Sequence, residues 1–417
     1  MGALSKPKSE DAVTLLPIDI EKAMQVLAGD PSRLNNRPVV AWDSERVAFL
    51  SAVSKAILAD PDARKLPDAV TFAYWARKGN LAAIETRTRV AGRVSMGLGL
   101  VFHVSPSNAP VNFAFSMAFG LLAGNSCVIR LPSAETATAT IIVRAVRHVL
   151  AQPEHEGIRG ALLLVRYARD DEVNRFWTGI ADGRVVWGGD ETVRQFRRYP
   201  APPRAREVSF ADRYSLCTLR PIAVLELDDA GLKALCSGLY NDIYLMDQAA
   251  CSSPQLVAWV GDAETVGRAQ DRLWPALVSQ VKERYDAPPI RLMDKFVRAC
   301  ESAATNAAVH HIQRHGNLLY RVALETLGPN PERCRGIAGT VHEVVLTSLD
   351  DLAPFINEIY QTLTYFGYGR EELTTFVQRH GLRGIDRIVP VGRALDMDVI
   401  WDGYEIVTGL SRTVDIR

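Results

Sequence analysis

The strongest constraint on the fold is an alternation of two kinds of segment between Val94 and Trp187. Short runs rich in β-branched residues predict strands, at residues 94–104, 126–131, 160–165 and 184–187. Between them, apolar residues recur every three or four positions and predict helices, at residues 111–123, 136–150 and 171–180. Strands joined by helical crossovers run parallel, so this region predicts a doubly wound sheet of the Rossmann type.

A second α/β region follows, with predicted strands at residues 223–227, 256–260 and 342–346 and a long helix at 264–285. The last part of the chain has only short β-rich pieces separated by turn residues, which cannot form a core alone. We therefore expect N-terminal helices and a cofactor-binding domain at 1–215, a catalytic domain at 216–385 and a β extension at 386–417. The extension should dock on another surface or another subunit, and residues 1–10 should fray.

Charge and composition exclude several classes of protein. The 417 residues include 48 Lys and Arg and 48 Asp and Glu, so the net charge of +0 favours neither nucleic acid nor an anionic membrane as partner. The longest apolar run, residues 111–123, is shorter than the ~20 residues needed to span a bilayer and is interpreted as a buried helix. The six cysteines form no CxxC pair and follow no signal peptide, which favours a reducing cytoplasm.

Three histidines invite a metal interpretation. His311 and His315, with His310 beside them, would share one face of a helix. Metal sites normally add a carboxylate or cysteine ligand and an ordered second shell, and none is evident in the neighbouring sequence. We therefore predict no metal site.

Two residues are candidates for catalysis and two for cofactor binding. Cys251 stands among small residues between a helix-like run and a strand-like run, where a nucleophilic sulfur would be accessible. Asn108, in the loop after the first strand, could donate its amide to a developing oxyanion. Gly188 and Gly189, between a strand and a helix, would let the backbone approach a dinucleotide. Each also has a purely structural interpretation: Cys251 as a buried thiol, Asn108 in an Asx turn, and the glycine pair as a turn that binds no ligand.

Taken together, five ordered segments resemble the aldehyde dehydrogenase superfamily. The resemblance is closest to its acyl-CoA reductase branch, the reductase subunit of the fatty acid reductase of bacterial bioluminescence, and covers about residues 72–417. The segments that carry it are 102–110 (FHVSPSNAP), 121–125 (LLAGN) with 130–133 (RLPS), 186–190 (VWGGD), 247–255 (DQAACSSPQ), and 387–393 (RIVPVGR) with 400–404 (IWDGY). The resemblance implies an α/β fold of the aldehyde dehydrogenase type.

The resemblance also implies roles for individual residues. Cys251 becomes the acyl-accepting nucleophile, and the oxyanion hole is formed by the amide of Asn108 with the backbone N–H of Cys251. Arg130 and Ser133 lie near the adenosine ribose, where a cation and a hydroxyl would accept a 2′-phosphate. The cofactor expected is NADPH, with NADH as the alternative. The loop that passes the cofactor diphosphate is matched by Gly188, Gly189 and Asp190.

The sequence departs from the superfamily pattern in three places. Arg130 replaces the usual lysine, and the extra Leu131 separates it from Pro132. Residues 209–213 (SFADR) stand where hydrolytic members carry the glutamate that activates water. The segment that holds the nicotinamide ribose has no clear match between Cys334 and Val341.

These features predict reduction of an acyl thioester, bound to CoA or to a carrier protein, to an aldehyde through an S-acyl-cysteine. Two alternatives remain open at this point: a hydrolytic aldehyde dehydrogenase, and a protein that transfers acyl groups without reducing them. The expected partners are the acyl-CoA or acyl-carrier-protein substrate and an acyl-protein synthetase. The expected assembly is a homodimer or a homotetramer.

Overall fold

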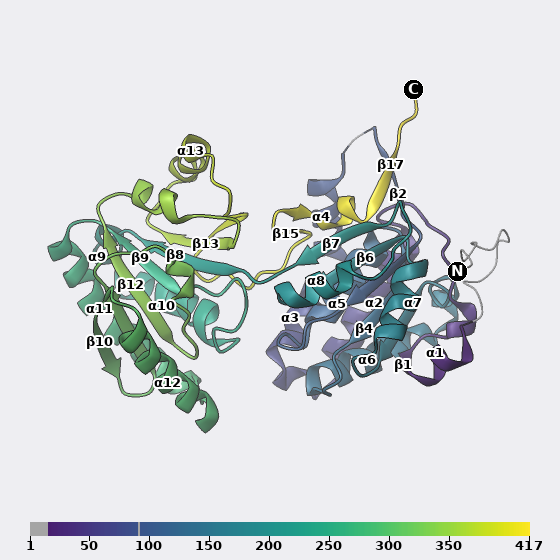
Figure 1. The fold of residues 1–417 in the computed structure, drawn as a ribbon, viewed down its shortest axis with the longest axis horizontal. Coiled ribbons are helices and arrows are strands. Elements are labelled where there is room, and N and C mark those ends of the chain that lie inside the picture. Colours follow the sequence, from purple (N-terminus) through teal and green to yellow (C-terminus); the bar gives the residue numbers. More distant parts are fainter. Residues whose placement is uncertain (1–15, 91) are drawn as a thin grey trace. The chain divides into compact units, whose positions relative to one another are not determined.

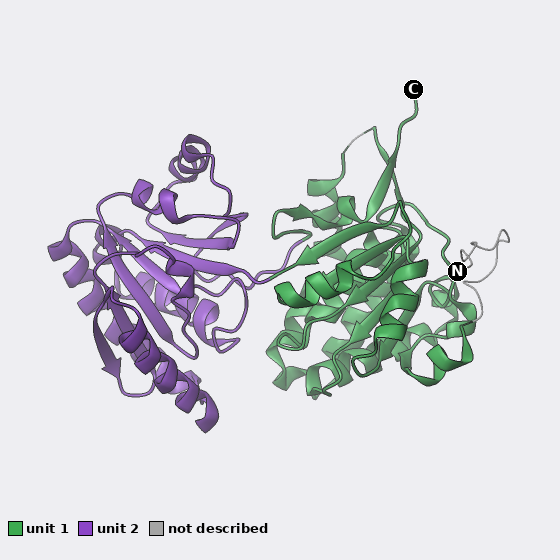
Figure 2. Ribbon diagram, in the orientation of Figure 1, with its two compact units in different colours: residues 1–211, 399–417 green, residues 212–398 purple. Residues whose placement is uncertain are grey.

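The computed structural model describes residues 16–90 and 92–417 and divides into two compact units. Unit 1 comprises residues 1–211 and 399–417, and unit 2 comprises residues 212–398 (Figure 2). The predicted C-terminal extension, residues 386–417, is thus divided: residues 386–398 belong to unit 2 and residues 399–417 to unit 1. The expectation for residues 1–10 lies outside the described residues.

Unit 1 contains a six-stranded sheet in the order β1-β5-β4-β3-β6-β7, parallel except for β1. Its strands are β1 (Gln25–Ala28), β3 (Leu100–Val104), β4 (Ser126–Leu131), β5 (Leu162–Arg166), β6 (Gly183–Trp187) and β7 (Arg206–Phe210). Among the five parallel strands, β3 comes first in the chain and is central, and later strands add on both sides of it, which is the order of a doubly wound sheet. The predicted Rossmann-type layout is confirmed.

Helices surround this sheet (Figure 1). They are α1 (Ile18–Lys22), α2 (Ser44–Ala59), α3 (Pro67–Trp75), α4 (Lys78–Thr88), α5 (Asn112–Leu122), α6 (Ala137–Leu150), α7 (Asp171–Ile180), α8 (Asp190–Arg197) and α14 (Ile406–Gly409), with 3-10 turns at Pro31–Arg33, Ala63–Lys65 and Pro153–Ile158.

Both faces of the sheet are covered, as adjacent residues of β3 show. The ring of Phe102 lies 6.3 Å from that of Trp177 on α7, whereas Nδ1 of His103 lies 2.8 Å from Oγ of Ser116 on α5. Successive strand residues point to opposite faces, so α7 and α5 cover different faces. Helix α5 is buried along nearly its whole length, as its composition predicts.

The segment predicted as one strand at 94–104 is two strands. β2 (Val94–Gly97) leaves the sheet and pairs antiparallel with β17 (Ser411–Val414). The break falls at Gly99, whose φ of 134° is open to glycine and where a Cβ would lie 2.3 Å from Oδ2 of Asp182. A second ribbon joins β15 (Ile400–Trp401) to β16 (Tyr404–Glu405), so the short β pieces of the tail pair as short ribbons.

Unit 2 contains a seven-stranded sheet in the order β10-β11-β12-β9-β8-β13-β14, parallel except for β10. The strands are β8 (Tyr214–Leu219), β9 (Leu256–Val260), β10 (Val309–His315), β11 (Leu319–Leu324), β12 (Thr340–Leu346), β13 (Tyr360–Phe366) and β14 (Arg387–Pro390). Its helices are α9 (Pro221–Leu225), α10 (Asp229–Tyr244), α11 (Ala263–Arg284), α12 (Pro289–Thr305) and α13 (Arg370–His380), with 3-10 turns at Pro331–Arg333 and Leu349–Phe355. Apolar clusters cover both faces of the sheet.

Two local predictions for unit 2 are wrong. The predicted strand at 223–227 overlaps helix α9, because Pro221 occupies the first helical turn, where its missing N–H costs nothing. His310, His311 and His315 lie on strand β10, not on a helix, because β10 pairs with β11 across a tight turn that contains Gly316 at φ 58°. Within residues 16–90 and 92–417, no three metal-binding side chains gather, and no helix is long and apolar enough to cross a membrane.

Candidate active site

The carboxyl ends of the unit 1 strands bring together the residues predicted to bind a cofactor. Ser105 follows β3, Arg130 lies near the end of β4, and Ser133 comes two residues after β4 ends. Gly188 and Gly189 follow β6, the strand on the other side of β3. In open parallel sheets, ligands bind at this edge where the strand order reverses, which here is between β3 and β6.

Arg130 and Ser133 meet on one aromatic residue. The guanidinium carbon of Arg130 lies 4.7 Å from the ring centre of Tyr167, and the hydroxyl of Ser133 donates a 3.2 Å hydrogen bond to the carbonyl oxygen of the same tyrosine. The phenol of Tyr167 donates in turn to Oδ1 of Asn174 at 2.9 Å. Tyr167 therefore contacts a cation through its ring and a hydroxyl through its backbone at the carboxyl edge of the sheet.

Two buried polar atoms at this edge have no hydrogen-bond partner among the described residues, Nε of Arg130 and Oγ of Ser105. A buried donor or acceptor without a partner is costly, so such atoms call for a ligand or water. The donor set fits the polar ribose and phosphate groups of a dinucleotide. The residues that would hold it are Arg130 and Ser133 with Ser105.

The glycine pair leaves the N-terminus of α8 open. Gly189 is the N-cap residue, and a Cβ placed on it would meet nothing within 4 Å. At Gly188 a Cβ would lie 2.9 Å from the side chain of Thr192, so only glycine fits there without adjustment. Asp190 begins the helix and pairs with Arg194 at 3.5 Å. The open backbone N–H groups at a helix N-terminus can hold a diphosphate.

Asn108 lies in the loop between β3 and α5 and is exposed. The loop is short and rich in proline and small residues, which keeps the chain out of the helix until Asn112. Asn108 belongs to unit 1, whereas Cys251 belongs to unit 2.

Cys251 lies on the turn between α10 and β9, and the predicted accessibility of its side chain is confirmed. The backbone of Cys251 is held by a hydrogen bond, because the hydroxyl of Ser215 donates to the carbonyl oxygen of Cys251 at 2.7 Å. The same hydroxyl accepts from the backbone N–H of Thr362 at 3.1 Å. Ser215 and Thr362 are near the amino ends of β8 and β13, so Cys251 lies at the amino edge of this sheet.

Exposure separates Cys251 from four of the other cysteines. Cys127, Cys217, Cys236 and Cys334 are buried, and burial raises the pKa of each thiol, to about 12 for the first two and to about 11 for the others. A thiol is nucleophilic as its thiolate, so these four are unsuited to attack a carbonyl near neutral pH. Cys300, on α12, is also exposed.

A cation near Cys251 was not singled out by the sequence. Burial lowers the pKa of the Arg387 guanidinium, while the charges of Asp396, Asp242, Asp398 and Cys251 oppose that shift. The guanidinium donates to the carbonyl oxygens of Arg393, Ala394 and Asp396 at 2.7–2.8 Å. Arg387 is the first residue of a segment that resembles the family pattern. Its interaction with Cys251 depends on the pairing of β14 with β13, which the sequence does not reveal.

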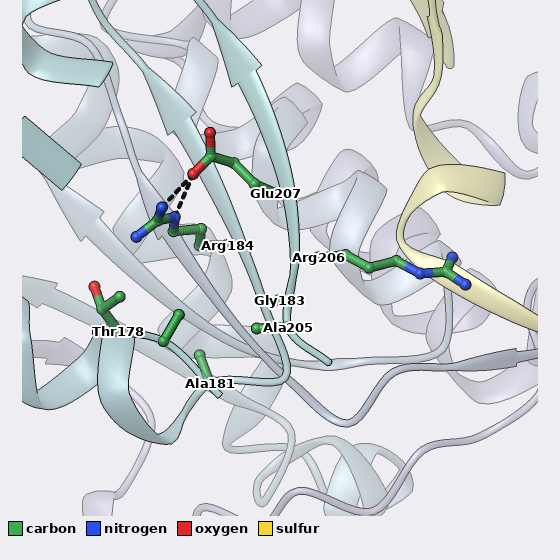
Figure 3. A pocket seen from close by; sticks show the side chains of 8 residues that line it. Thr178, Ala181, Gly183, Arg184, Ala205, Arg206 and Glu207 are labelled. Carbon is green, nitrogen blue, oxygen red and sulfur yellow. Dashed lines mark hydrogen bonds and ion pairs between the residues drawn. The ribbon is translucent and has the colours of Figure 1, made fainter. Parts of the chain in front are cut away.

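One pocket of unit 1 lies away from these residues. It is lined by Thr178, Gly183, Arg184 and Arg206 among others, and Gly183 and Arg206 are the first residues of β6 and β7. Figure 3 shows Arg184 and Glu207 facing each other while Arg206 points away. The pocket is therefore at the amino edge of the sheet, opposite to the carboxyl edge that carries Arg130 and Gly188.

Comparison with known proteins identifies the family. The acyl-CoA reductase (LuxC) family matches residues 87–413, which is most of the chain. The chain belongs to the acyl-CoA reductase (LuxC) family. The predicted family is confirmed.

Curated relatives of this acyl-CoA reductase family member share limited identity with it. The long-chain acyl-protein thioester reductase of Aliivibrio fischeri is 23% identical over 301 residues, which cover 70% of this chain and 58% of that protein. Long-chain acyl-protein thioester reductase 2 of Photobacterium leiognathi is 28% identical over 166 residues, or 40% of this chain and 33% of that protein. The chain thus spans between a third and three fifths of the length of these relatives.

Solved structures establish the fold of this acyl-CoA reductase family member. Lactaldehyde dehydrogenase from Escherichia coli superposes with a TM-score of 0.63 at 15% identity, over 89% of this chain and 85% of that one. A glyceraldehyde-3-phosphate dehydrogenase from Methanocaldococcus jannaschii, complexed with NADP, gives 0.58 at 14% identity, over 89% and 88%. At these identities the likeness concerns the fold alone, and the predicted aldehyde dehydrogenase-like fold is confirmed.

Proposed function

We propose that the chain reduces an acyl thioester to an aldehyde through an acyl group carried on Cys251. The observation that carries the proposal is the exposed thiol of Cys251, held by its carbonyl oxygen on a turn at a sheet edge. Membership of the acyl-CoA reductase family and the names of the relatives support the reaction class.

The first step is acyl transfer between sulfur atoms. The Cys251 thiolate attacks the thioester carbonyl, the new C–S bond forms, and the bond to the leaving thiol breaks with that thiolate taking the electron pair. Attacking and leaving sulfurs have similar basicity, so the transfer is nearly balanced in free energy. The residues therefore have to orient the groups and stabilise the tetrahedral oxyanion, the role that we propose for the amide of Asn108 and the N–H of Cys251.

The second step needs a hydride donor. When bound, a reduced nicotinamide cofactor supplies the hydride that adds to the acyl carbon. The resulting thiohemiacetal on Cys251 then collapses, its C–S bond breaks, and aldehyde leaves as the thiolate is regenerated.

We propose NADPH as the preferred cofactor and NADH as the alternative. The guanidinium of Arg130 near the end of β4 would donate charge-assisted hydrogen bonds to a 2′-phosphate, and the hydroxyl of Ser133 would do the same after turning from the carbonyl oxygen of Tyr167. The diphosphate would lie at the N-terminus of α8, over Gly188, Gly189 and Asp190. The carboxylate of Asp190 is engaged by Arg194, which reduces its repulsion of that anion.

The position that matches the glutamate of hydrolytic aldehyde dehydrogenases supports reduction over hydrolysis. Ser209 stands there, and its hydroxyl donates a 2.7 Å hydrogen bond to Oε1 of Glu207. A serine hydroxyl is too weak a base to activate water on an acyl-cysteine. An acyl-enzyme that awaits hydride benefits from the absence of such a base, because water is then a competitor.

We propose that the acyl group arrives on CoA or on a carrier protein, the latter with an acyl-protein synthetase as partner. We also propose a homodimer or homotetramer in which the tail strands take part, because β17 leaves one edge of its two-stranded ribbon without a strand neighbour in the described residues.

The test is intact-mass analysis of the protein with a panel of acyl-CoA thioesters, with and without NADPH. Wild type and Cys300→Ala, which removes the other exposed thiol, should both gain an acyl mass that disappears when NADPH is added. Cys251→Ala should gain no such adduct and oxidise no NADPH. Acyl-dependent NADPH oxidation that persists in Cys251→Ala would refute the proposal, and release of free acid instead of aldehyde would favour a hydrolytic enzyme.

A further inference from the structure

The turn that carries Cys251 begins with two residues in a backbone conformation that side-chain-bearing residues rarely adopt. Asp247 and Gln248 have φ values of 49° and 60°. Non-glycine residues in this region cost free energy and persist only where the surroundings hold them. Gln248 is only 1% exposed, although Cys251 three residues later is exposed.

The side chain of Gln248 uses every hydrogen-bonding position of its carboxamide. Nε2 donates to the carbonyl oxygens of Pro254 at 2.8 Å and of Thr340 at 2.9 Å. Oε1 accepts from the backbone N–H groups of Gly339 at 3.2 Å and Thr340 at 3.1 Å. A carboxamide has two N–H donors and two lone pairs, so Gln248 is fully satisfied.

These four bonds close the Cys251 turn on itself and fix it to a distant part of the chain. The bond to Pro254 joins the two ends of the turn, and the bonds to Gly339 and Thr340 tie it to the start of β12. Cys251 lies between the two ends so joined. One buried side chain therefore supplies four of the hydrogen bonds that shape the turn.

Neighbouring contacts support the same attachment. The N–H of Ala338 donates to the carbonyl oxygen of Asp247 at 3.0 Å. Gln255 donates from Nε2 to the carbonyl oxygen of Gln248 at 3.0 Å and accepts at Oε1 from the N–H of Gly336 at 2.7 Å. The backbone from Gly336 to Thr340 thus forms a platform for the nucleophile turn.

We propose that Gln248 is a positioning residue for Cys251: its carboxamide holds the nucleophile turn on the platform of residues 336–340 in the shape that attack on a thioester carbonyl requires. The inference rests on the proposed role of Cys251. A misplacement of about 1 Å can cost on the order of 10²-fold in rate, because the reacting atoms must approach along a narrow range of directions.

The matched variants are Gln248→Met and Gln280→Met. Methionine keeps the length of the side chain and removes all four hydrogen bonds of Gln248. Gln280, on α11 of the same unit, donates to the carbonyl oxygen of Lys233 at 2.9 Å and accepts from Ser237 at 3.0 Å, and neither partner belongs to the turn or to the platform. Should Gln248→Met be insoluble, Gln248→Glu replaces it, since glutamate keeps the acceptor side and loses the two N–H donors.

Two measurements on the full chain follow. Hydrogen–deuterium exchange should be faster in peptides that cover residues 245–256 and 336–341 in the Gln248 variant and unchanged there in Gln280→Met. The single-turnover rate of Cys251 acylation at saturating acyl-CoA should fall about 10²-fold in the Gln248 variant. The KM for acyl-CoA should stay within about threefold of wild type, because the variant alters the approach of the sulfur and not the binding of substrate.

Unchanged exchange, or faster exchange with a wild-type acylation rate, would overturn the positioning role. An equal loss of rate in Gln248 and Gln280 variants would also overturn it, since it would reflect general destabilisation. If wild type itself forms no acyl adduct with any thioester, the proposed function fails, and the exchange result still shows whether Gln248 holds the turn.

Discussion

The buried carboxyl group of Asp242 makes the stability of unit 2 depend on pH. Asp242 is 1% exposed on α10, and its two oxygens accept from the backbone N–H groups of Gly392 at 2.7 Å and Ala394 at 2.9 Å. Burial raises the pKa of this carboxyl from 3.8 to about 7, although the two N–H donors act to lower it. The segment that Asp242 holds also supplies carbonyl oxygens to Arg387.

The size of the effect follows from this shift. A rise from 3.8 to about 7 is a change of about three pKa units, and at ~1.4 kcal/mol per unit it corresponds to at most about 4 kcal/mol. The folded state holds the proton more tightly than the unfolded state, so the contribution is fully present below about pH 3.8 and is lost as the pH rises toward 7.

The variant Asp242→Asn removes this titration. Urea unfolding of both proteins between about pH 4.5 and 8 should show wild type losing stability relative to the variant as the pH rises, by about 3 kcal/mol, because the rest of the shift lies below pH 4.5. The matched control is Asp286→Asn, an exposed loop position of the same unit, which should follow the pH dependence of wild type. A constant difference in unfolding free energy between wild type and Asp242→Asn across this range would refute the reasoning.

Two further predictions concern the cofactor edge and the tail. Arg130→Gln should weaken NADPH binding about tenfold or more while changing NADH binding little, because only NADPH carries the phosphate; isothermal titration with both cofactors checks this, and an equal loss for both would contradict it. Deletion of residues 411–417 removes β17 and leaves β2 without its partner, so the protein should become monomeric or insoluble by size-exclusion chromatography, and a soluble truncation with the wild-type elution volume would contradict the proposed role of the tail.

Where the periodicity is strong, local sequence patterns predicted the limits of an element to within a few residues. The strands at 126–131 and 256–260 and the helix at 171–180 have the predicted limits. Residues 223–227 are apolar enough for a strand, but Pro221 begins a helix there.

The candidate site divides in the same way. Cys251 and the glycine pair could be found from small residues at the junction of elements, and the structure shows that Cys251 is exposed and that the space beside Gly189 is open. Gln248 stands in one of the segments that carry the family resemblance, but no local pattern predicts its role, because its carboxamide bonds to residues up to 92 positions away. The role of Arg387 could not be predicted from the sequence either, since its charge interacts with Cys251 only because β14 pairs with β13.

The sequence alone determined the alternation of strands and helices in the Rossmann-type half of the chain, the family and the position of an accessible cysteine, since these depend on periodicity and on motifs within short segments. The tertiary structure decided how β2 pairs with β17, where the units divide and which buried side chain holds the nucleophile turn. These are hydrogen bonds and contacts between residues far apart in the chain, and many partners satisfy the same local pattern until packing selects one.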